Sequence, residues 1–359
     1  MQKLRLAVIF GGVSSEHEVS ERSAASVISN LSADKYDIIK IGITKEGQWF
    51  LYNGSVKNIR NGSWVQNPGN LSAFISPDRV NSGLMVSKDG SFHRILIDVI
   101  FPVLHGKNCE DGTIQGLFEL SGIPYVGCGT LASAVCMDKA ITHTLLSAAR
   151  DIDQTNYLWF YADRYNKAAD VIEDKIEARL TFPVFVKPAN AGSSVGVSRV
   201  SRREDLHEAI QKAAAEDIKI LVENEVVGQE VECAVIGNEN PEASVVGEIA
   251  VTAEFYDYND KYVNNTSQCI IPANIPAKAA QKVRETAVRA YRHLGCRGLA
   301  RVDFFVTEDL RVVLNEINTM PGFTDISMYP KLWEAESMSY PAVLDRLIDC
   351  ALEAGKTHG

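Results

Sequence analysis

Residues 301–318 read RVDFFVTEDLRVVLNEIN. On both sides of a short polar turn, β-branched and aromatic residues alternate with polar ones, which predicts an antiparallel hairpin. Residues two apart in a strand share a face, so Arg301 joins Asp303, and Glu316 joins Asn318. Hard oxygen ligands beside a guanidinium suit Mg²⁺ that carries a polyphosphate. The plain alternative is a strand face that only meets solvent.

The composition limits what kind of protein this is. With 359 residues, 46% of them hydrophobic and 23% charged, the chain is typical of a soluble protein of two or three domains. A net charge of −10 and the lack of a basic stretch argue against nucleic-acid binding. No leader and no apolar run of about 18 residues is present, so we expect a cytoplasmic protein that does not enter a membrane. The seven cysteines lack CxxC spacing and are expected to be reduced thiols.

The N-terminal part has the pattern of a doubly wound sheet. An apolar strand over Leu4–Phe10 runs into Gly11-Gly12, and helical spacing follows over Ser20–Leu31. Further buried strands are predicted over Ile38–Ile43 and Ile95–Val103. Loops at the carboxyl ends of such strands face a ligand crevice. Without a complete GxGxxG motif, a nicotinamide cofactor, and hence an oxidoreductase, is disfavoured.

Two more units are predicted after this sheet. The second begins near Cys128, and the third begins near Gly228 and contains the hairpin. The expected elements of both units are a helix over Leu131–Leu146, a strand over Pro183–Pro188, a strand ending at Glu223, a polar loop over 256–268, a helix over Lys278–Leu294 and a last helix over Tyr340–Ala354.

Four loops carry groups suited to binding. Lys187 ends a strand before the turn 192–196, where glycines and serines can bring N–H and hydroxyl donors to phosphate oxygens; a flexible hairpin is the alternative. The segment 221–228 is typical of a hinge between domains whose backbone groups hydrogen-bond to the edge of an adenine ring. The alternative is a simple linker between domains. His105 opens a polar, glycine-rich loop after a strand, and Glu16 lies in the loop after the first strand, where it holds an ammonium group or caps the next helix.

Several motifs then occur in a fixed order. They are HGKNCEDGTIQG (105–116), KPANAGSSVG (187–196), Lys261-Tyr262, Arg301-Val302-Asp303, NEINT (315–319) and SMYP (327–330). On these motifs the chain resembles the D-alanine–D-alanine ligases of the ATP-grasp superfamily from about Leu4 to Leu352. The resemblance implies an α/β (α+β) fold of three domains. These are an N-terminal Rossmann-like open parallel sheet (1–127), a central ATP-grasp subdomain (128–227) and a C-terminal ATP-grasp subdomain with the metal and catalytic site (228–359).

The resemblance also implies the chemistry. ATP would phosphorylate the carboxylate of one D-alanine, and the amine of a second would attack the acyl phosphate, giving D-alanyl-D-alanine for peptidoglycan. ATP as a substrate, two Mg²⁺ or Mn²⁺ ions and a homodimer are expected.

Site residues carry over by motif position. The metal ligands would be Asp303, Glu316 and Asn318. Glu16, linked to Ser193 and Tyr262, would orient the first substrate, while Arg301 and the Gly322 N–H would stabilise the oxyanion. The remaining expected contacts are His105 for the first substrate, Ser327 and Met328 for the second, and for ATP Lys139, Lys187, Ser193, Ser194, Glu223, Val226, Glu230, Phe255 and Lys261.

The resemblance also bears on substrate specificity, and the chain departs from the family pattern at two places. Tyr262 with Met328 favours D-alanine over D-lactate or D-serine as the second substrate, although a D-serine or D-lactate ligase stays an alternative. Cys109 stands where the family has glycine, and would be strained if that position has a positive φ. The segment 150–156 lacks the usual glycine and proline, and is expected to be a surface linker. A degenerate nucleotide-binding protein without turnover is the remaining alternative.

Overall fold

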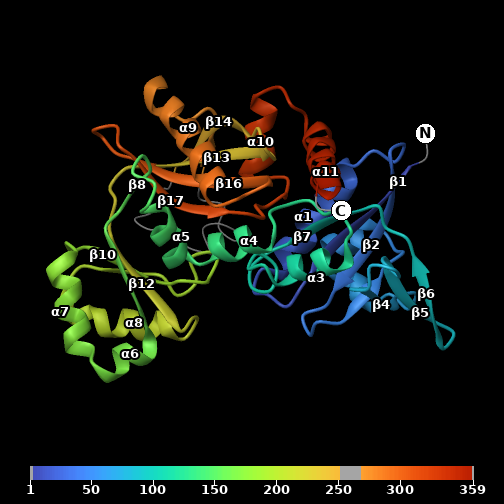
Figure 1. Cartoon of the computed structure of the whole chain (residues 1–359), viewed down its shortest axis with the longest axis horizontal. Coiled ribbons are helices and arrows are strands. Elements are labelled where there is room, and N and C mark those ends of the chain that lie inside the picture. Colours follow the sequence, from blue (N-terminus) through green and yellow to red (C-terminus); the bar gives the residue numbers. More distant parts are fainter. Residues whose placement is uncertain (1–2, 251–267, 358–359) are drawn as a thin grey trace.

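The computed structural model describes residues 3–250 and 268–357. Within these ranges the strands form three sheets, of seven, four and six strands. Figure 1 shows the seven-stranded sheet and its helices at one end of the molecule, with the four-stranded sheet as a lobe at the other end. The six-stranded sheet lies beside both.

The N-terminal sheet has the strand order β6-β5-β4-β3-β2-β1-β7. β1 is parallel to β2 and to β7, as predicted for a doubly wound sheet. The antiparallel pairs from β2 to β6 were not predicted. The elements of this part are β1 (Leu4–Gly11), α1 (His17–Asn30), β2 (Tyr36–Ile43), β3 (Trp49–Leu51), α2 (Val56–Arg60), the 3₁₀ turn Ser63–Gln66, β4 (Leu71–Ile75), β5 (Leu84–Lys88), β6 (Ser91–Ile95), β7 (Val99–Leu104) and α3 (Thr113–Ser121).

The end of β1 needs a glycine. Gly11 has a φ of +90°, and a Cβ there would lie 2.1 Å from the backbone oxygen of Ile43. Only glycine tolerates this conformation and this close approach at little cost. The turn carries the chain from β1 toward the loop that contains Glu16, directly before α1.

The four-stranded sheet is antiparallel, in the order β11-β10-β12-β9. Apolar residues of its strands and helices form a core of their own, which includes Val184, Val186 and Ile220. The predicted strands at 183–188 and before Glu223 are confirmed. The elements are β9 (Tyr157–Tyr161), α6 (Ala162–Lys167), α7 (Ala169–Arg179), β10 (Val184–Pro188), β11 (Ser198–Val200), the 3₁₀ turn Arg203–Asp205, α8 (Leu206–Ala214) and β12 (Lys219–Asn224).

The six-stranded sheet has the order β15-β14-β13-β16-β17-β8. The predicted hairpin is confirmed, with Arg301 opposite Asn318 and Asp303 opposite Glu316. The register shifts between Asp303 and Phe304, so the strand is irregular next to the polar residues. The elements are β8 (Asp153–Gln154), β13 (Gln229–Gly237), β14 (Glu242–Ala250), β15 (Gln268–Ile270), α9 (Ala277–His293), β16 (Gly298–Val306), β17 (Val312–Asn318), α10 (Met328–Ala335) and α11 (Tyr340–Thr357).

Two predictions about connecting segments were wrong in part. The single helix predicted over Leu131–Leu146 is two helices, α4 (Thr130–Met137) and α5 (Lys139–Leu146). Asp138 separates them because it has extended backbone and its side chain accepts a hydrogen bond from the N–H of Ile141, at 3.0 Å. The segment 150–156, expected to be only a linker, supplies β8, which pairs in parallel with β17.

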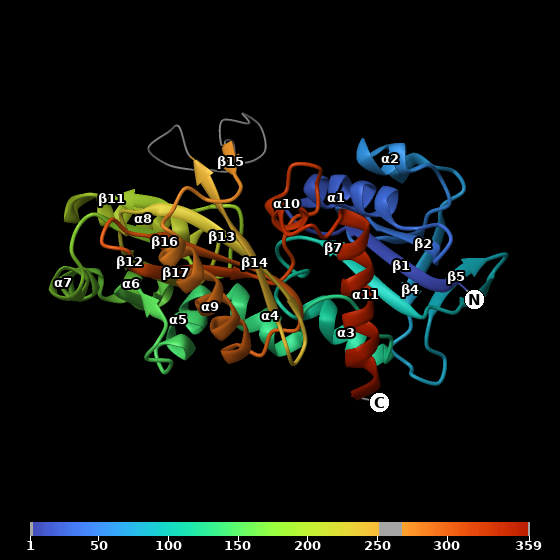
Figure 2. The same ribbon diagram turned by 90° about the horizontal axis from the view of Figure 1, so that it is seen from above.

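The last helix joins two of the units. α11 contacts α1 and β7 on one side and β13 and β16 on the other, and Figure 2 shows it at the junction. The part of the chain that the structure describes contains no helix long and apolar enough to cross a bilayer. The subdomain limits at 127 and 227 stay predictions.

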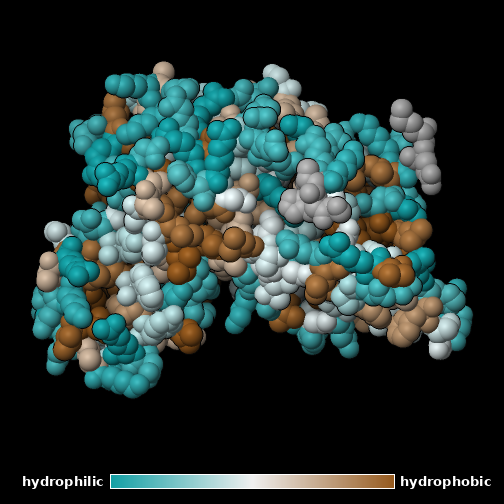
Figure 3. All heavy atoms as spheres, in the orientation of Figure 1, coloured by the Kyte–Doolittle hydropathy of each residue, from teal (hydrophilic) through white to brown (hydrophobic). Residues whose placement is uncertain are grey.

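The surface has an apolar area near the middle of one face. Figure 3 shows it in brown over the region where Figure 1 places α4 and α5. These helices carry the exposed side chains of Leu131 and Leu145.

Candidate active site

Two cavities adjoin at the centre of the molecule. A cavity of about 540 Å³ lies between the four-stranded and six-stranded sheets. A second one, of about 370 Å³, is lined by loops of the N-terminal sheet, by β17 and by the start of α10. Both are lined by Ser193, Ile249 and Glu316. Groups bound in the two cavities can therefore meet at these three residues.

The polar face of the hairpin borders the smaller cavity. Two nitrogens of the Arg301 guanidinium donate to the two carboxylate oxygens of Asp303, at 2.8 and 2.7 Å. Arg301 also lies 3.1 Å from Glu232 of β13. Burial opposes the charge of Arg301, but Asp303 and Glu232 hold its pKa well above the ordinary value. Arg301 therefore keeps its positive charge inside the protein.

The three predicted metal ligands lie together on this hairpin. The Asn318 amide donates to Asp303 at 2.9 Å, and Glu316 lies 3.2 Å from the Lys139 ammonium. Among the described residues no three His, Cys, Asp or Glu side chains form a metal cluster. Two carboxylates and a carboxamide do fit Mg²⁺, because this ion usually takes only one or two carboxylates and completes its shell with phosphates and water.

Two of the lysines predicted to contact phosphate, Lys139 and Lys187, line the larger cavity. Lys139 is the first residue of α5 and donates to the Ala191 carbonyl at 2.9 Å. Lys187 forms an ion pair with the buried Glu223. Burial by itself would raise the pKa of Glu223, but Lys187 and His143 overcome this and lower the pKa to about 2. The other predicted ATP residues that the structure describes also line this cavity: Ser193, Ser194, Val226 and Glu230.

The glycine-serine turn connects two units. Ser193 and Ser194 have positive φ angles of 51° and 59°, which non-glycine residues seldom adopt. The Ser193 hydroxyl donates to Glu16 at 2.6 Å. At Gly192, a Cβ would lie 3.0 Å from Glu16, so the glycine permits this approach. The predicted link between Glu16 and Ser193 is confirmed.

His105 lines the smaller cavity. Its ring nitrogens lie 3.1 Å from the Met320 carbonyl and 3.3 Å from the Ser23 hydroxyl. Burial lowers the pKa of His105, only partly opposed by Glu16. The ring is therefore neutral near pH 7, and its Nδ1–H donates to the Met320 carbonyl.

The rest of the His105 loop is not strained at Cys109. The left-handed φ of +66° falls on Asn108, and Cys109 is not among the residues with positive φ. Cys109 is buried, and its carbonyl accepts a hydrogen bond from Gln115 at 2.8 Å. Burial, followed by repulsion from Glu16, raises the pKa of the neighbouring Glu110 to about 8. Glu110 is thus mostly protonated at neutral pH.

The predicted second-substrate residues lie at the start of α10. These residues, Ser327 and Met328, line the smaller cavity, and so does Gly322, which was predicted to stabilise the oxyanion. The Ser327 hydroxyl accepts a hydrogen bond from the Thr324 N–H at 2.9 Å. A Cβ on Gly247 of β14 would lie 2.8 Å from the Met328 sulfur. This glycine therefore lets α10 pack closely on the sheet.

Three predicted residues, Phe255, Lys261 and Tyr262, lie outside the described residues. Conversely, the structure adds residues that no motif indicated. Glu232 pairs with Arg301, but it comes from a strand distant in sequence. Lys331 lines the smaller cavity one turn after Met328, and this helical spacing was the only signal for it.

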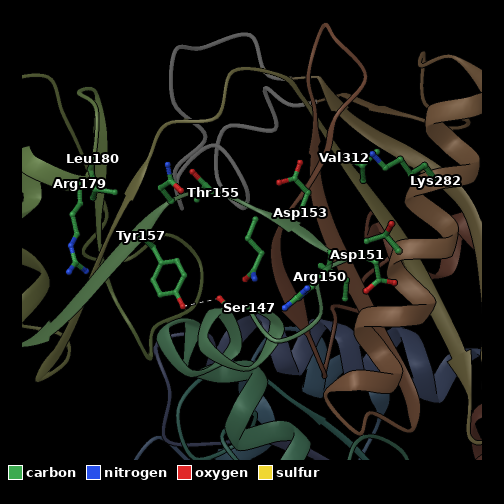
Figure 4. A pocket seen from close by; sticks show the side chains of 14 residues that line it. Ser147, Arg150, Asp151, Asp153, Thr155, Tyr157, Arg179, Leu180, Lys282 and Val312 are labelled. Atoms are coloured by element: carbon green, nitrogen blue, oxygen red, sulfur yellow. Dashed lines mark hydrogen bonds between the residues drawn. The ribbon is translucent and has the colours of Figure 1, made fainter.

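A third cavity, of about 800 Å³, lies beside the segment 150–156 (Figure 4). The Tyr157 and Ser147 hydroxyls lie 3.2 Å apart there. Asp151 and Asp153 are paired with Arg289 and Arg311 respectively. None of the described residues of the predicted site lines this cavity, although Thr155 lines both it and the larger cavity.

The fold is that of an ATP-grasp ligase. Family models for the N-terminus and C-terminus of D-Ala–D-Ala ligases match residues 5–128 and 146–349. The chain belongs to the D-alanine–D-alanine ligase family.

Similar proteins cover nearly the whole chain. The D-alanine–D-alanine ligase of Caldicellulosiruptor bescii is 49% identical, over 99% of this chain and 97% of its own length. The one of Ruminiclostridium cellulolyticum is 51% identical, over 98% and 96%. Among solved structures, the VanG D-Ala:D-Ser ligase from Enterococcus faecalis has a TM-score of 0.89 and 43% identity, covering 98% of this chain and 100% of that one. The D-alanine–D-alanine ligase from Coxiella burnetii has a TM-score of 0.85 and 32% identity, covering 99% and 96%.

Proposed function

We propose that the protein uses ATP to join two D-alanine molecules into D-alanyl-D-alanine for peptidoglycan synthesis. The observation that carries this proposal is the shared border of the two cavities at Ser193 and Glu316. A terminal phosphate in the larger cavity can meet a carboxylate in the smaller one at this border. The reaction needs this meeting, because a carboxylate becomes a good electrophile only after phosphorylation.

Two displacements make up the reaction. A carboxylate oxygen of the first D-alanine attacks the γ-phosphorus, and ADP leaves. The amine of the second D-alanine, after losing a proton, attacks the acyl carbon, and inorganic phosphate leaves. Negative charge develops on the phosphoryl group and then on the tetrahedral carbon, so fixed positive groups stabilise both transition states.

Residues of the larger cavity hold the nucleotide. Lys139 and Lys187 contact its phosphates, with the Ser193–Ser194 turn beside them. Asp303, Glu316 and Asn318 hold Mg²⁺ or Mn²⁺, which when bound neutralises charge on the phosphates. Two ions are proposed, as the family resemblance implies.

Residues of the smaller cavity hold the first D-alanine. The Glu16 carboxylate, fixed by the Ser193 hydroxyl at 2.6 Å, accepts a hydrogen bond from the substrate ammonium. His105, being neutral, orients the carboxylate without adding charge. Arg301 and the Gly322 N–H face the oxygen of the tetrahedral intermediate. Arg301 keeps its charge there because Asp303 and Glu232 compensate it.

Ser327 and Met328 line the binding site of the second substrate. The apolar side chain of Met328 offers no partner to a serine hydroxyl, which favours D-alanine. A D-serine ligase is the runner-up, because the VanG structure has 43% identity with this chain. We further propose that the enzyme acts in the cytoplasm as a homodimer, in line with its seven free thiols and with the family resemblance.

The test supplies ATP, Mg²⁺ and D-alanine, and follows phosphate release and the mass of the product. We expect one phosphate released for each D-alanyl-D-alanine formed. Competition between D-alanine and equal concentrations of D-serine and D-lactate distinguishes the alternatives. If D-alanyl-D-serine or D-alanyl-D-lactate is the main product, the protein is the corresponding D-serine or D-lactate ligase. If ATP binds but no product forms with any of the three, the protein is a binding protein without turnover.

A further inference from the structure

The smaller cavity is acidic, and one of its cations has no ion-pair partner among the described residues. Its lining carboxyl groups belong to Glu16, Glu110, Glu232 and Glu316, whereas its lining cations are Arg301 and Lys331. Arg301 is held by Asp303 and Glu232. The Lys331 ammonium forms no ion pair or hydrogen bond with the side chains and backbone of residues 3–250 and 268–357.

Packing of α10 fixes the place of Lys331. Met328 and Leu332 of this helix are 4% and 0% exposed, and both lie against Gly247, where a Cβ would be 2.8 Å from each. Residues three apart on a helix are neighbours on one face. Lys331 therefore follows Met328 along the side of α10 that lines the cavity, and both residues do line it.

A free amino acid in this cavity needs a positive partner for its carboxylate. The proposed function requires the amine of the second D-alanine to face the acyl phosphate, near Arg301 and Glu316. Its carboxylate then points away from these residues, toward the part of the cavity formed by Ser327, Met328 and Lys331. In an acidic cavity an uncompensated carboxylate is repelled, and neither Ser327 nor Met328 brings a charge.

We propose that Lys331 binds the carboxylate of the second D-alanine and so sets the affinity for the nucleophile. This inference rests on the proposed function and adds to it a residue outside the family motifs. Lys331 lines the smaller cavity beside Ser327 and Met328 and does not line the larger cavity, which holds ATP in the proposed function. Its loss therefore affects one of the two D-alanine sites and not the other.

The experiment compares Lys331→Met with the unchanged enzyme, using ATP, Mg²⁺ and D-alanine. The initial rate as a function of D-alanine concentration gives separate KM values for the first and second molecules. Loss of a hydrogen bond to a charged group should raise the second KM about tenfold or more. The first KM and the KM for ATP should change less than about twofold. Lys331→Arg should restore most of the affinity, because it keeps the charge.

Lys278→Met is the matched control, since Lys278 is an exposed lysine at the start of α9. Circular dichroism and binding of ADP establish that each variant is folded. The inference is overturned if the KM for the second D-alanine in Lys331→Met stays within twofold of that of the unchanged enzyme. It is also overturned if Lys331→Arg raises this KM as much as Lys331→Met does. If the unchanged enzyme makes no dipeptide, the proposed function itself has failed, which is a separate result.

Discussion

Replacing Lys187 by methionine should destabilise the four-stranded sheet. The substitution keeps an unbranched side chain of similar length, but it removes the ion pair with Glu223. Glu223 is 6% exposed, so water cannot replace the lost partner. Breaking a buried ion pair by removing one partner is strongly destabilising, because the other charge stays buried.

The pKa of Glu223 gives the size of the effect. Its pKa falls from an ordinary 4.5 to about 2 in the folded protein, against burial and because of Lys187 and His143. At 1.36 kcal/mol for each pKa unit this amounts to about 3 kcal/mol. A carboxyl whose folded pKa is lowered contributes stability above pH 4.5, which is lost as the pH falls from 4.5 toward 2.

In Lys187→Met, burial of Glu223 is no longer offset by the lysine, and its folded pKa rises. The variant should therefore be less stable than the unchanged protein by about 3 kcal/mol at pH 7. The difference should shrink as the pH falls, first through the raised pKa of Glu223 in the variant and then from 4.5 toward 2, where the unchanged protein loses its stabilisation. Hydrogen exchange of peptides from β10 and β12 measures the opening free energy of this sheet alone. Lys175→Met, at an exposed lysine of α7, is the control. A difference below about 1 kcal/mol at pH 7, or one that does not vary with pH, refutes the reasoning.

Three further substitutions test the active site. Glu316→Gln should abolish dipeptide formation while the melting temperature stays near that of the exposed control Glu308→Gln; an active variant would contradict a metal-holding role. Ser193→Ala removes the 2.6 Å hydrogen bond to Glu16 and should raise the first D-alanine KM about tenfold. Ser194→Ala, at a residue that lines only the larger cavity, should leave that KM unchanged, and equal effects would argue against the link. Gly247→Ala should lower the free energy of unfolding by about 1–3 kcal/mol by overpacking against Met328 and should raise the KM for the second D-alanine. An unchanged unfolding free energy in a denaturant titration would show that α10 can shift away from β14 without cost.

The hairpin and its polar face could be predicted from sequence because the pattern has period two. That period fixes which side chains of one strand share a face. The pairing of Arg301 with Asn318 does not follow from it, because this pairing depends on the register shift between Asp303 and Phe304. The three parallel strands of the N-terminal sheet were equally visible as apolar runs. For the ATP, metal and substrate residues, the family resemblance supplied roles that no single loop could have supplied.

What the sequence did not reveal depends on contacts between distant segments. The apolar pattern continues across Asp138, so the break between α4 and α5 was hidden; the structure shows that Asp138 caps α5 and pairs with Lys219. β8 is two residues long and exists because it pairs with β17. Glu232 has no local signal for its contact with Arg301, since the two meet only when β13 and β16 pair.

The common border of the two cavities has a consequence for inhibitors. Ser193, Ile249 and Glu316 line both, so one elongated compound can occupy the two volumes at once. Once its first half is bound, the second half has a high effective concentration at its own subsite, and avidity can exceed either separate affinity without any new contact. This border is therefore the place to join fragments found separately for each cavity.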